Sequence, residues 1–377
     1  MAEAKSRADA IGAMLQRIDR TISEREGGFP HFADPQTGTW TRSPAGDWTG
    51  GFWVGELWLA ERLTGERRYH DEALRWSDKL RPRATSDTVF RGFLFWYGAA
   101  IGAILTGDDD ARRCALGGAT GLAGLYDPVA GAIPLGTTAE EASSVGRTEA
   151  NIDGVPGGTP LLAWASANGG SPSLMQIALA HAERHIELCI RDDGSVCQSA
   201  SFDPTSGALV RRYTHKGIHD DSTWTRAQAW AMLGFAQAMR YAPERFAEVA
   251  TRVADWWLAR IPADGVAYWD FDAQPGADTE RDTSGTAIAA AALLKLAILL
   301  PERADEYRTA AEQMVDALIQ RHLTPVGARD RRPVGILADG CYNKRIGLAT
   351  RAELVWGDYF LFESLLVLDG RLDPALT

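Results

Sequence analysis

Two tryptophans, an arginine and a glutamine lie close together in residues 220–230. Trp224 precedes Gln228 by four residues, a spacing that would place both side chains on one face of a helix. Arg226 and Trp230 have the same spacing. A flat aromatic wall beside a fixed cation suits a sugar ring that carries a carboxylate. The alternative interpretation is an Arg–Trp stack that only closes a contact between two helices.

Basic residues are concentrated in and just before this stretch, although the chain as a whole is acidic. The formal net charge of −11 argues against nucleic-acid binding and against long-range attraction of a polyanion. Within 211–226, only Asp220 and Asp221 oppose a group of cationic and histidine side chains. That group consists of Arg211, Arg212, His215, Lys216, His219 and Arg226. A local cationic pocket suits a small anionic substrate, whereas the alternative is chance clustering on a solvated loop.

The amino-acid composition limits the class of protein to which the chain can belong. With 45% hydrophobic and 24% charged residues among 377, the chain is expected to be an ordinary globular protein. The charged N-terminus lacks an apolar h-region, and the longest apolar run, 286–300, contains Lys295 and is too short to span a bilayer. We therefore expect a cytoplasmic protein with no membrane partner.

The spacing of cysteine, histidine and glycine residues indicates whether the chain binds a metal or a nucleotide cofactor. Four cysteines without CxxC spacing predict reduced thiols, and seven histidines without HExxH-like spacing predict that there is no metal site. The chain contains neither a Gly-rich nucleotide motif nor Gly-X-Ser-X-Gly. We therefore expect no cofactor, and the serine-hydrolase class is disfavoured.

Two kinds of helix alternate along the chain, and strand-like alternation is scarce. Apolar helices, expected to be buried, begin near residues 48, 92, 158, 222, 283 and 356. Amphipathic helices, expected to form an outer layer, cover about 5–22, 67–80, 109–125, 173–190, 242–260 and 303–322. Asp221 or Ser222 is placed to cap the helix that begins near 222.

This alternation predicts an all-α fold, a closed (α/α)6 toroid of six helical hairpins that forms one domain over residues 1–377. The N-terminal helix would pair with the last inner helix. Insertions before the inner helices would gather on one rim, where a rigid scaffold positions functional loops. The starts of the inner helices are 44 to 73 residues apart, which disfavours the alternative, an α-solenoid of fixed period.

Aromatic and charged residues recur at the starts of the inner helices. They are Trp48, Trp53, Asp153, Trp224, Arg226, Trp230, Asp282, Trp356 and Asp358. A toroid would bring them to one central mouth, whereas a solenoid would spread them along a groove. Aromatic and acidic residues around one deep cleft favour a carbohydrate-active protein.

Several of these residues belong to motifs that resemble the unsaturated glucuronyl hydrolases of glycoside hydrolase family 88. In chain order the motifs are Asp47-Trp48-Thr49-Gly50-Gly51-Phe52-Trp53, Asn151-Ile152-Asp153, Pro160-Leu161-Leu162-Ala163-Trp164-Ala165, Thr214-His215, residues 222–230, Tyr268-Trp269-Asp270-Phe271, Arg281-Asp282-Thr283-Ser284 and Trp356-Gly357-Asp358-Tyr359. The similarity is collinear from about residue 25 to 368. It implies a six-hairpin toroid, in agreement with the helical pattern.

The resemblance implies an unusual hydrolysis of small anionic oligosaccharides that polysaccharide lyases leave with a 4,5-unsaturated uronic acid at the non-reducing end. One aspartate, here Asp153, protonates C4 and then, as a base, activates water for addition at C5. Both roles need a pKa raised toward neutrality, which apolar neighbours such as Ile152, Val155 and Trp164 could supply. A helix N-cap is the alternative role for Asp153. The expected substrate-binding residues are Trp48, His215, Lys216, Trp224, Arg226, Gln228 and Trp230.

The chain departs from the family pattern at its second essential aspartate, which would contact substrate hydroxyls and help to raise the pKa of the acid. Phe90 stands at that position, and Asp87 or Asp220 could substitute for the lost carboxylate. A family tryptophan is missing near Gly136, and Lys216 stands where glutamine is common. The glycine-rich segment between Asp153 and Pro160 is one residue longer than usual.

These departures leave two alternatives open. One is a different enzyme on the same toroid: a uronide lyase, an epimerase, or an ordinary glycosidase with a carboxyl pair roughly 5–9.5 Å apart, Asp153 with Asp220 or Asp282. The replacement at Phe90 favours this alternative. The other is a sugar-binding protein without activity. The parent polysaccharide, linkage, sulfation and oligomeric state are not predicted.

Overall fold

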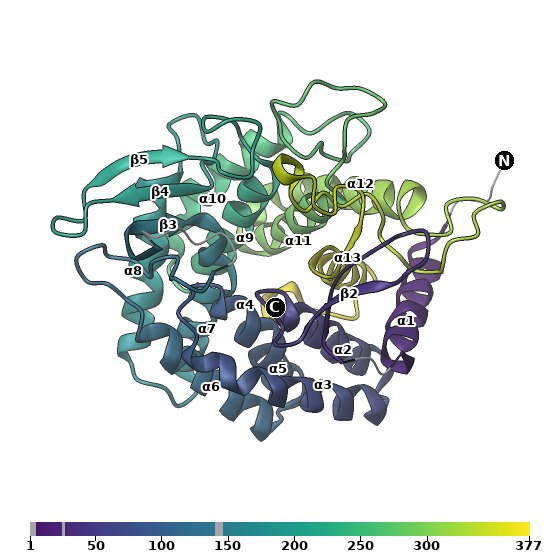
Figure 1. Ribbon diagram of the computed structural model, residues 1–377, viewed down its shortest axis with the longest axis horizontal. Coiled ribbons are helices and arrows are strands. Elements are labelled where there is room, and N and C mark those ends of the chain that lie inside the picture. The colour runs from purple at the N-terminus through teal and green to yellow at the C-terminus, as the bar shows by residue number, and fades with distance from the viewer. Residues whose placement is uncertain (1–4, 25–26, 140–145) are drawn as a thin grey trace.

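Two concentric layers of helices make up the computed structural model, which describes residues 5–24, 27–139 and 146–377 (Figure 1). The inner layer consists of α2 (Gly50–Thr64), α4 (Arg91–Phe95) continued by η2 (Trp96–Ala100) and α5 (Ile101–Thr106), α7 (Val155–Ala167), α9 (Thr225–Met239), α11 (Thr283–Leu299) and α13 (Val355–Leu368). The outer layer consists of α1 (Arg7–Ser23), α3 (Arg67–Leu80), α6 (Asp109–Ala123), α8 (Ser173–Cys189), α10 (Pro243–Leu258) and α12 (Ala304–Arg321). The predicted (α/α)6 toroid is confirmed.

The ring closes between the two ends of the sequence. Each inner helix packs against the next, and α13 packs against both α2 and α1. Figure 1 shows the yellow α13 beside the purple α1 and α2. The expected pairing of the N-terminal helix with the last inner helix is therefore confirmed.

Residue patterns explain the two layers. Nearly all of α11 is buried because its apolar and small residues leave no polar face. By contrast, α10 buries one stripe that includes Phe246, Val249, Val253 and Trp257. Glycine allows the inner helices to approach closely: a Cβ on Gly92 of α4 would lie 2.5 Å from the backbone nitrogen of Gly158 in α7. This contact brings the start of α4 to the start of α7.

Two three-stranded antiparallel sheets lie in the insertions before the inner helices. One has the order β2 (Trp40–Ser43), β1 (Phe29–Ala33), β6 (Glu353–Leu354). The other has the order β3 (Glu149–Asn151), β4 (Ser199–Phe202), β5 (Leu209–Tyr213). The sequence pattern did not predict these strands, because they are two to five residues long and β5 is largely exposed, without alternation.

No helix within the described residues combines the length and apolarity that crossing a bilayer requires. Residues 1–4 of the charged N-terminal segment lie outside the described residues.

Candidate active site

A small cavity of about 250 Å³ lies at the N-terminal ends of the inner helices. Residues from several loops and helices converge on it. Its lining consists of Trp48, Phe90, Phe93, Asp153, Lys216, Trp224, Arg226 and Trp230. Six of these were predicted site residues, so the toroid brings together positions that are far apart in sequence.

The β3–β4–β5 sheet positions one side of this cavity. Because neighbouring strands are antiparallel, the end of β3, the start of β4 and the end of β5 lie at one edge, where Asn151 pairs with Ser199 and Ser199 with Tyr213. Asp153, Gln198 and Lys216 follow or precede these strand ends by one to three residues. The sheet thus delivers a carboxyl, an amide and an ammonium group to the same wall.

Asp153 is buried and held from two sides. Its side chain is 6% exposed, and Gln198 donates from Nε2 to Asp153 Oδ2 at 3.2 Å. The Asp153 backbone N–H donates to Asn151 Oδ1 at 3.0 Å, and the next residue in the turn, Gly154, is the N-cap of α7 without a side-chain cap bond. The N-cap interpretation of Asp153 is therefore wrong, because Asp153 lies inside the preceding turn.

A buried histidine supports this turn from behind. His181 of α8 accepts the Ile133 N–H on Nδ1 at 3.0 Å, so its Nε2 carries the proton that it donates to the Gly154 carbonyl at 3.2 Å. Burial keeps the pKa of His181 well below its usual value. A neutral imidazole therefore fixes the backbone beside Asp153.

Aromatic rings form most of the remaining wall. Trp230 packs against Phe93 with ring centroids 4.9 Å apart, and Trp48 lies 5.8 Å from the same phenylalanine. Trp48 donates from Nε1 to the hydroxyl oxygen of Tyr342 at 3.2 Å, and its ring lies 4.7 Å from that of Trp356. Such surfaces suit the faces of a sugar ring.

Two cations face the cavity, in different environments. Arg226 is 1% exposed and donates to Asp282 Oδ2 at 2.6 Å and to the carbonyl oxygens of Cys341 and Tyr342. The Lys216 ammonium lies 5.7 Å from the Trp224 ring centroid and 5.2 Å from that of Tyr342. The arrangement can hold an anionic sugar ring on aromatic faces and move a proton at Asp153.

Curated relatives identify the family. The chain is 34% identical over 380 residues to an unsaturated glucuronyl hydrolase of Bacillus sp. (strain GL1), covering 98% of this chain and 97% of that protein. It is 30% identical over 378 residues to an unsaturated chondroitin disaccharide hydrolase of Streptococcus pneumoniae (strain ATCC BAA-255 / R6), covering 93% and 90%. The chain belongs to the unsaturated glucuronyl hydrolases.

Solved structures of this glycoside hydrolase family agree with the fold. The crystal structure of the Bacillus sp. GL1 unsaturated glucuronyl hydrolase matches with a TM-score of 0.89 at 33% identity over 97% of each chain. The crystal structure of an unsaturated glucuronyl hydrolase specific for heparin matches with a TM-score of 0.86 at 25% identity, over 96% of this chain and 97% of that one. No protein-family model matches the chain.

One expected substrate contact is not where the unsaturated glucuronyl hydrolase motif suggested. Gln228 points away from the cavity and donates from Nε2 to the carbonyl oxygens of Gly194 at 3.0 Å and Val253 at 2.9 Å. Trp224 is the extended N-cap of α9, with φ −64° and ψ 130°, so the four-residue helical spacing does not put it on the face of Gln228. Arg226 and Trp230, both inside α9, do share the cavity face.

The expected cap of α9 is also wrong. Trp224 occupies the N-cap position without a side-chain bond, while the Ser222 hydroxyl donates to Asp270 Oδ2 at 2.8 Å. His215 is half-buried beside Lys216, and its Nδ1 lies 3.2 Å from the Ser199 hydroxyl. These residues shape the loop before α9.

The carboxyls suggested as partners of Asp153 lie elsewhere. Asp87 is bound to Thr137, whose hydrogen bonds lower the pKa of this carboxyl, and Asp220 is exposed and 3.7 Å from Arg345. Asp282 caps α11 and is fully engaged by Arg226 and Ser284. Among the described residues, Asp153 is thus the one carboxyl group that lines the cavity.

Two other residues expected at the mouth face different directions. Trp53 packs toward α3, with its ring 6.5 Å from that of Trp76. Asp358 is buried beside Glu56 and Glu353, whose charges together with burial raise its pKa well above the usual value. Their positions at the starts of inner helices did not predict which way these two side chains point.

Sequence reasoning missed Gln198, Phe93 and Tyr342, all buried at or behind the cavity wall. Gln198 has no motif of its own, and its role depends on the pairing of β4 with β3. Phe93 lies three residues after Phe90, the position where the chain departs from the family pattern, and that spacing was an available signal.

Proposed function

We propose that this protein hydrolyses oligosaccharides that carry a 4,5-unsaturated uronic acid at the non-reducing end, with Asp153 as the general acid and base. The single observation that carries the proposal is the buried carboxyl of Asp153 in a cavity walled by Trp48, Trp224 and Trp230. The cationic side chain of Lys216 lines the same cavity. Membership of the unsaturated glucuronyl hydrolases supports the same reaction.

In the proposed reaction, Asp153 gives its proton to C4 of the double bond, and positive charge develops at C5 next to the ring oxygen. The resulting carboxylate then takes a proton from water as that water adds to C5. The C5 hemiketal opens and the adjoining glycosidic bond is released, so water is consumed and the carboxyl regains its proton. Gln198, bound to Asp153 Oδ2 at 3.2 Å, would keep the carboxyl oriented through both steps.

Substrate recognition is divided among the remaining lining residues. We assign ring stacking to the tryptophans and attraction of the uronate carboxylate to Lys216 and Arg226. The guanidinium of Arg226 is also paired with Asp282, and the Lys216 ammonium lies 5.7 Å from the Trp224 ring centroid. Phe90 supplies an apolar surface where the family pattern has a carboxylate, which suits a sugar with fewer free hydroxyls at that side.

The test follows the ultraviolet absorbance of the conjugated C4=C5 carboxylate during incubation with lyase-generated disaccharides. Disaccharides from chondroitin and heparin form the first panel, because relatives are named for these sources. Wild type and Asp220→Asn should both bleach the absorbance, and Asp153→Asn should reduce the rate by about 10²–10⁴-fold. Activity that survives in Asp153→Asn would reject the assigned role.

We also propose that the chain acts as one catalytic domain in the cytoplasm. The contacts of α1 with α13 and α12 tie the first helix into the ring, which supports a single unit. The four cysteines are buried free thiols, which suits a reducing compartment. Cell fractionation with an antibody against the protein would test the location.

A further inference from the structure

The loop of residues 214–222 brings Lys216 to the active-site cavity. Its two ends are joined, because the Thr214 hydroxyl donates to the carbonyl oxygen of Ser222 at 3.0 Å. Its middle faces solvent, and Ile218 is 40% exposed. Segments with few buried contacts open easily, so the position of Lys216 depends on what holds this loop.

One side of the loop is attached beside the general acid. The Lys216 N–H donates to Gln198 Oε1 at 3.1 Å, and the Gln198 carbonyl oxygen accepts the Ile152 N–H at 3.0 Å. On the outside, Arg345 donates to the His215 carbonyl oxygen at 3.0 Å, but the side chain of Arg345 is 40% exposed. A buried attachment beyond Lys216 would hold the loop from its second side.

The buried carboxyl of Asp270 supplies that second attachment. Its Oδ2 accepts the Ile218 N–H at 3.0 Å and the Ser222 hydroxyl at 2.8 Å, and its Oδ1 accepts the Asp272 N–H at 2.9 Å. Gly217 permits this close approach, since a Cβ there would lie 2.8 Å from Asp270 Oδ2 and 2.3 Å from Ser222 Oγ. One carboxyl oxygen therefore ties the exposed middle of the loop to its end.

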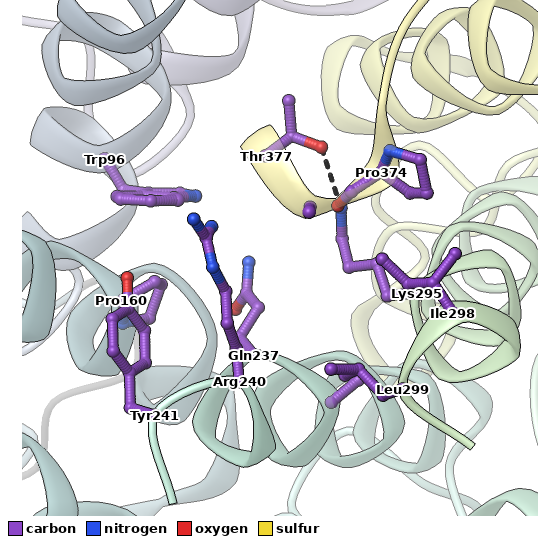
Figure 2. Close-up of a pocket in the computed structure, with 12 residues that line it drawn as sticks. Trp96, Pro160, Gln237, Arg240, Tyr241, Lys295, Ile298, Leu299, Pro374 and Thr377 are labelled. Atoms are coloured by element: carbon purple, nitrogen blue, oxygen red, sulfur yellow. Dashed lines mark hydrogen bonds between the residues drawn. The ribbon is translucent and has the colours of Figure 1, made fainter. Parts of the chain in front are cut away.

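Hydrogen-bond donors, rather than a cation, balance the Asp270 carboxyl. In the part of the chain that the structure describes, no cationic side chain lies within 4.0 Å of it. By contrast, the buried carboxyl of Glu363 is paired with Lys295 at 2.8 Å, and Figure 2 shows that lysine hydrogen-bonded to the Thr377 hydroxyl. Burial raises the pKa of Asp270, and its hydrogen bonds oppose that rise. Because a buried carboxyl without donors is costly, loop conformations that withdraw these donors are disfavoured.

Main-chain hydrogen bonds hold Trp224, the next cavity residue, independently of this carboxyl. Trp224 and Asp270 form an antiparallel β-bridge. Beside it, the Phe271 N–H donates to the Thr223 carbonyl oxygen at 3.0 Å. A change of the Asp270 side chain should therefore alter the place of Lys216 and leave Trp224 where it is.

We infer that Asp270 is a positioning residue whose carboxylate fixes the 214–222 loop and thereby places the Lys216 ammonium for the uronate carboxylate of the substrate. Asp270 does not line the cavity, so it acts through the loop. The inference rests on the proposed function, in which Lys216 attracts that carboxylate.

Asp270→Asn and Ser222→Ala test the inference in the absorbance assay. Asp270→Asn turns one acceptor oxygen into a donor and should raise KM for the lyase-generated disaccharides by about tenfold, because hydrogen bonds to a charged group are lost. Ser222→Ala removes one donor, keeps the carboxyl in place and should raise KM by about threefold. In both variants kcat should change by less than about twofold, since Gln198 keeps its contact with Asp153.

A Lys216→Met background separates positioning from general damage to the fold. Because Asp270 acts through Lys216 in this inference, Asp270→Asn should leave the KM of Lys216→Met almost unchanged. An equal further rise of KM in that background would overturn the inference. Two controls should keep the wild-type KM: Glu363→Gln, which alters a buried carboxyl far from the cavity, and Asp109→Asn, whose side chain is 77% exposed on α6.

Hydrogen exchange followed by mass spectrometry gives a readout that needs no substrate. Amides of residues 215–222 should exchange about tenfold faster in Asp270→Asn than in wild type or Asp109→Asn. Unchanged exchange in Asp270→Asn and Ser222→Ala, or an unchanged KM in Asp270→Asn, would overturn the inference. If wild type bleaches no disaccharide while exchange in Asp270→Asn is faster, the proposed hydrolysis is rejected and the attachment of the loop to Asp270 is supported.

Discussion

Phe90 contributes an apolar side chain to the cavity that Asp153 lines. Its ring is 3% exposed and lies 6.1 Å from Phe93 and 6.4 Å from Trp48, so this side of the carboxyl is apolar. A second carboxylate at position 90 would disfavour ionisation of Asp153 through like-charge repulsion. An aspartate at position 90 would therefore act on the Asp153 carboxyl through its charge, which the phenylalanine of this chain lacks.

Phe90→Asp should move the alkaline limb of the kcat/KM profile to higher pH relative to Phe90→Asn. The two replacements have nearly the same size and remove the same ring, so their difference isolates the added charge. The measurement is the absorbance assay at a series of pH values. Superimposable profiles of the two variants would show that position 90 does not influence the acid.

Gln198 is a positioning residue: it donates from Nε2 to Asp153 Oδ2 at 3.2 Å and accepts the Lys216 backbone N–H on Oε1 at 3.1 Å. Gln198→Leu should lower kcat by about tenfold with a smaller change in KM, since one hydrogen bond to the charged carboxylate is lost. The same loss should shift the pH–rate limb upward, because the ionised form loses a donor. Gln313→Leu, exposed on α12, serves as the control. A lower kcat without any shift of the limb would indicate a purely structural role.

At the level of elements, sequence periodicity predicted the helices well. The buried and amphipathic helices differ in local composition, as α11 and α10 illustrate, so their order and approximate starts follow from the sequence. The strands of the β3–β4–β5 sheet were not predictable, because their stability comes from pairing between distant segments. Gln198 was missed for the same reason, since its position follows from that pairing.

The prediction of site residues was wrong at the first turn of α9, where the start of the helix determines which way each side chain points. Trp224 and Gln228 were expected on one face, but α9 begins at Thr225, so only Arg226 and Trp230 follow helical periodicity. The helix start therefore misplaced Trp224, whereas Gln228 lies two residues from both Arg226 and Trp230, about 200° around the helix, and so cannot share their face.

Helix α8, which supports the turn that contains Asp153, should make the stability of the fold depend on pH. His185 is buried, with Nδ1 2.7 Å from the His181 carbonyl, and burial lowers the pKa of His185 to about 4. Between about pH 6.5 and 4 the unfolded chain takes up a proton that the folded protein refuses, so stability falls as pH falls, by roughly 1.4 kcal/mol per pH unit.

His185→Gln should remove this contribution. Urea unfolding followed by circular dichroism at several pH values between 4.5 and 7.5 would compare the variant with wild type. The wild-type free energy of unfolding should fall more steeply toward low pH than that of the variant. Parallel curves would mean that His185 titrates normally in the folded state.

For the whole molecule, closure of the ring depends on contacts between its first and last elements. Arg17 of α1 donates to Glu353 of β6 at 2.6 and 2.7 Å, and both side chains are almost fully buried. Burial raises the pKa values of Glu353, Glu56 and Asp358, and the charge of Arg17 opposes that rise in all three. One guanidinium therefore compensates a cluster of buried carboxyls at the junction of α1, α2 and α13.

Arg17→Met should lower the free energy of unfolding by about 3–5 kcal/mol, because it leaves buried carboxyl groups without their cation. Arg7→Met on the same helix removes a more exposed pair with Asp316 at 2.9 Å and should cost at most about 1 kcal/mol. Adding Glu353→Gln to Arg17→Met should recover part of the loss, since the uncompensated charge is removed as well. Urea unfolding at neutral pH measures all three variants. If Arg17→Met costs no more than Arg7→Met, or if the double variant is less stable than Arg17→Met alone, ring closure does not depend on this ion pair.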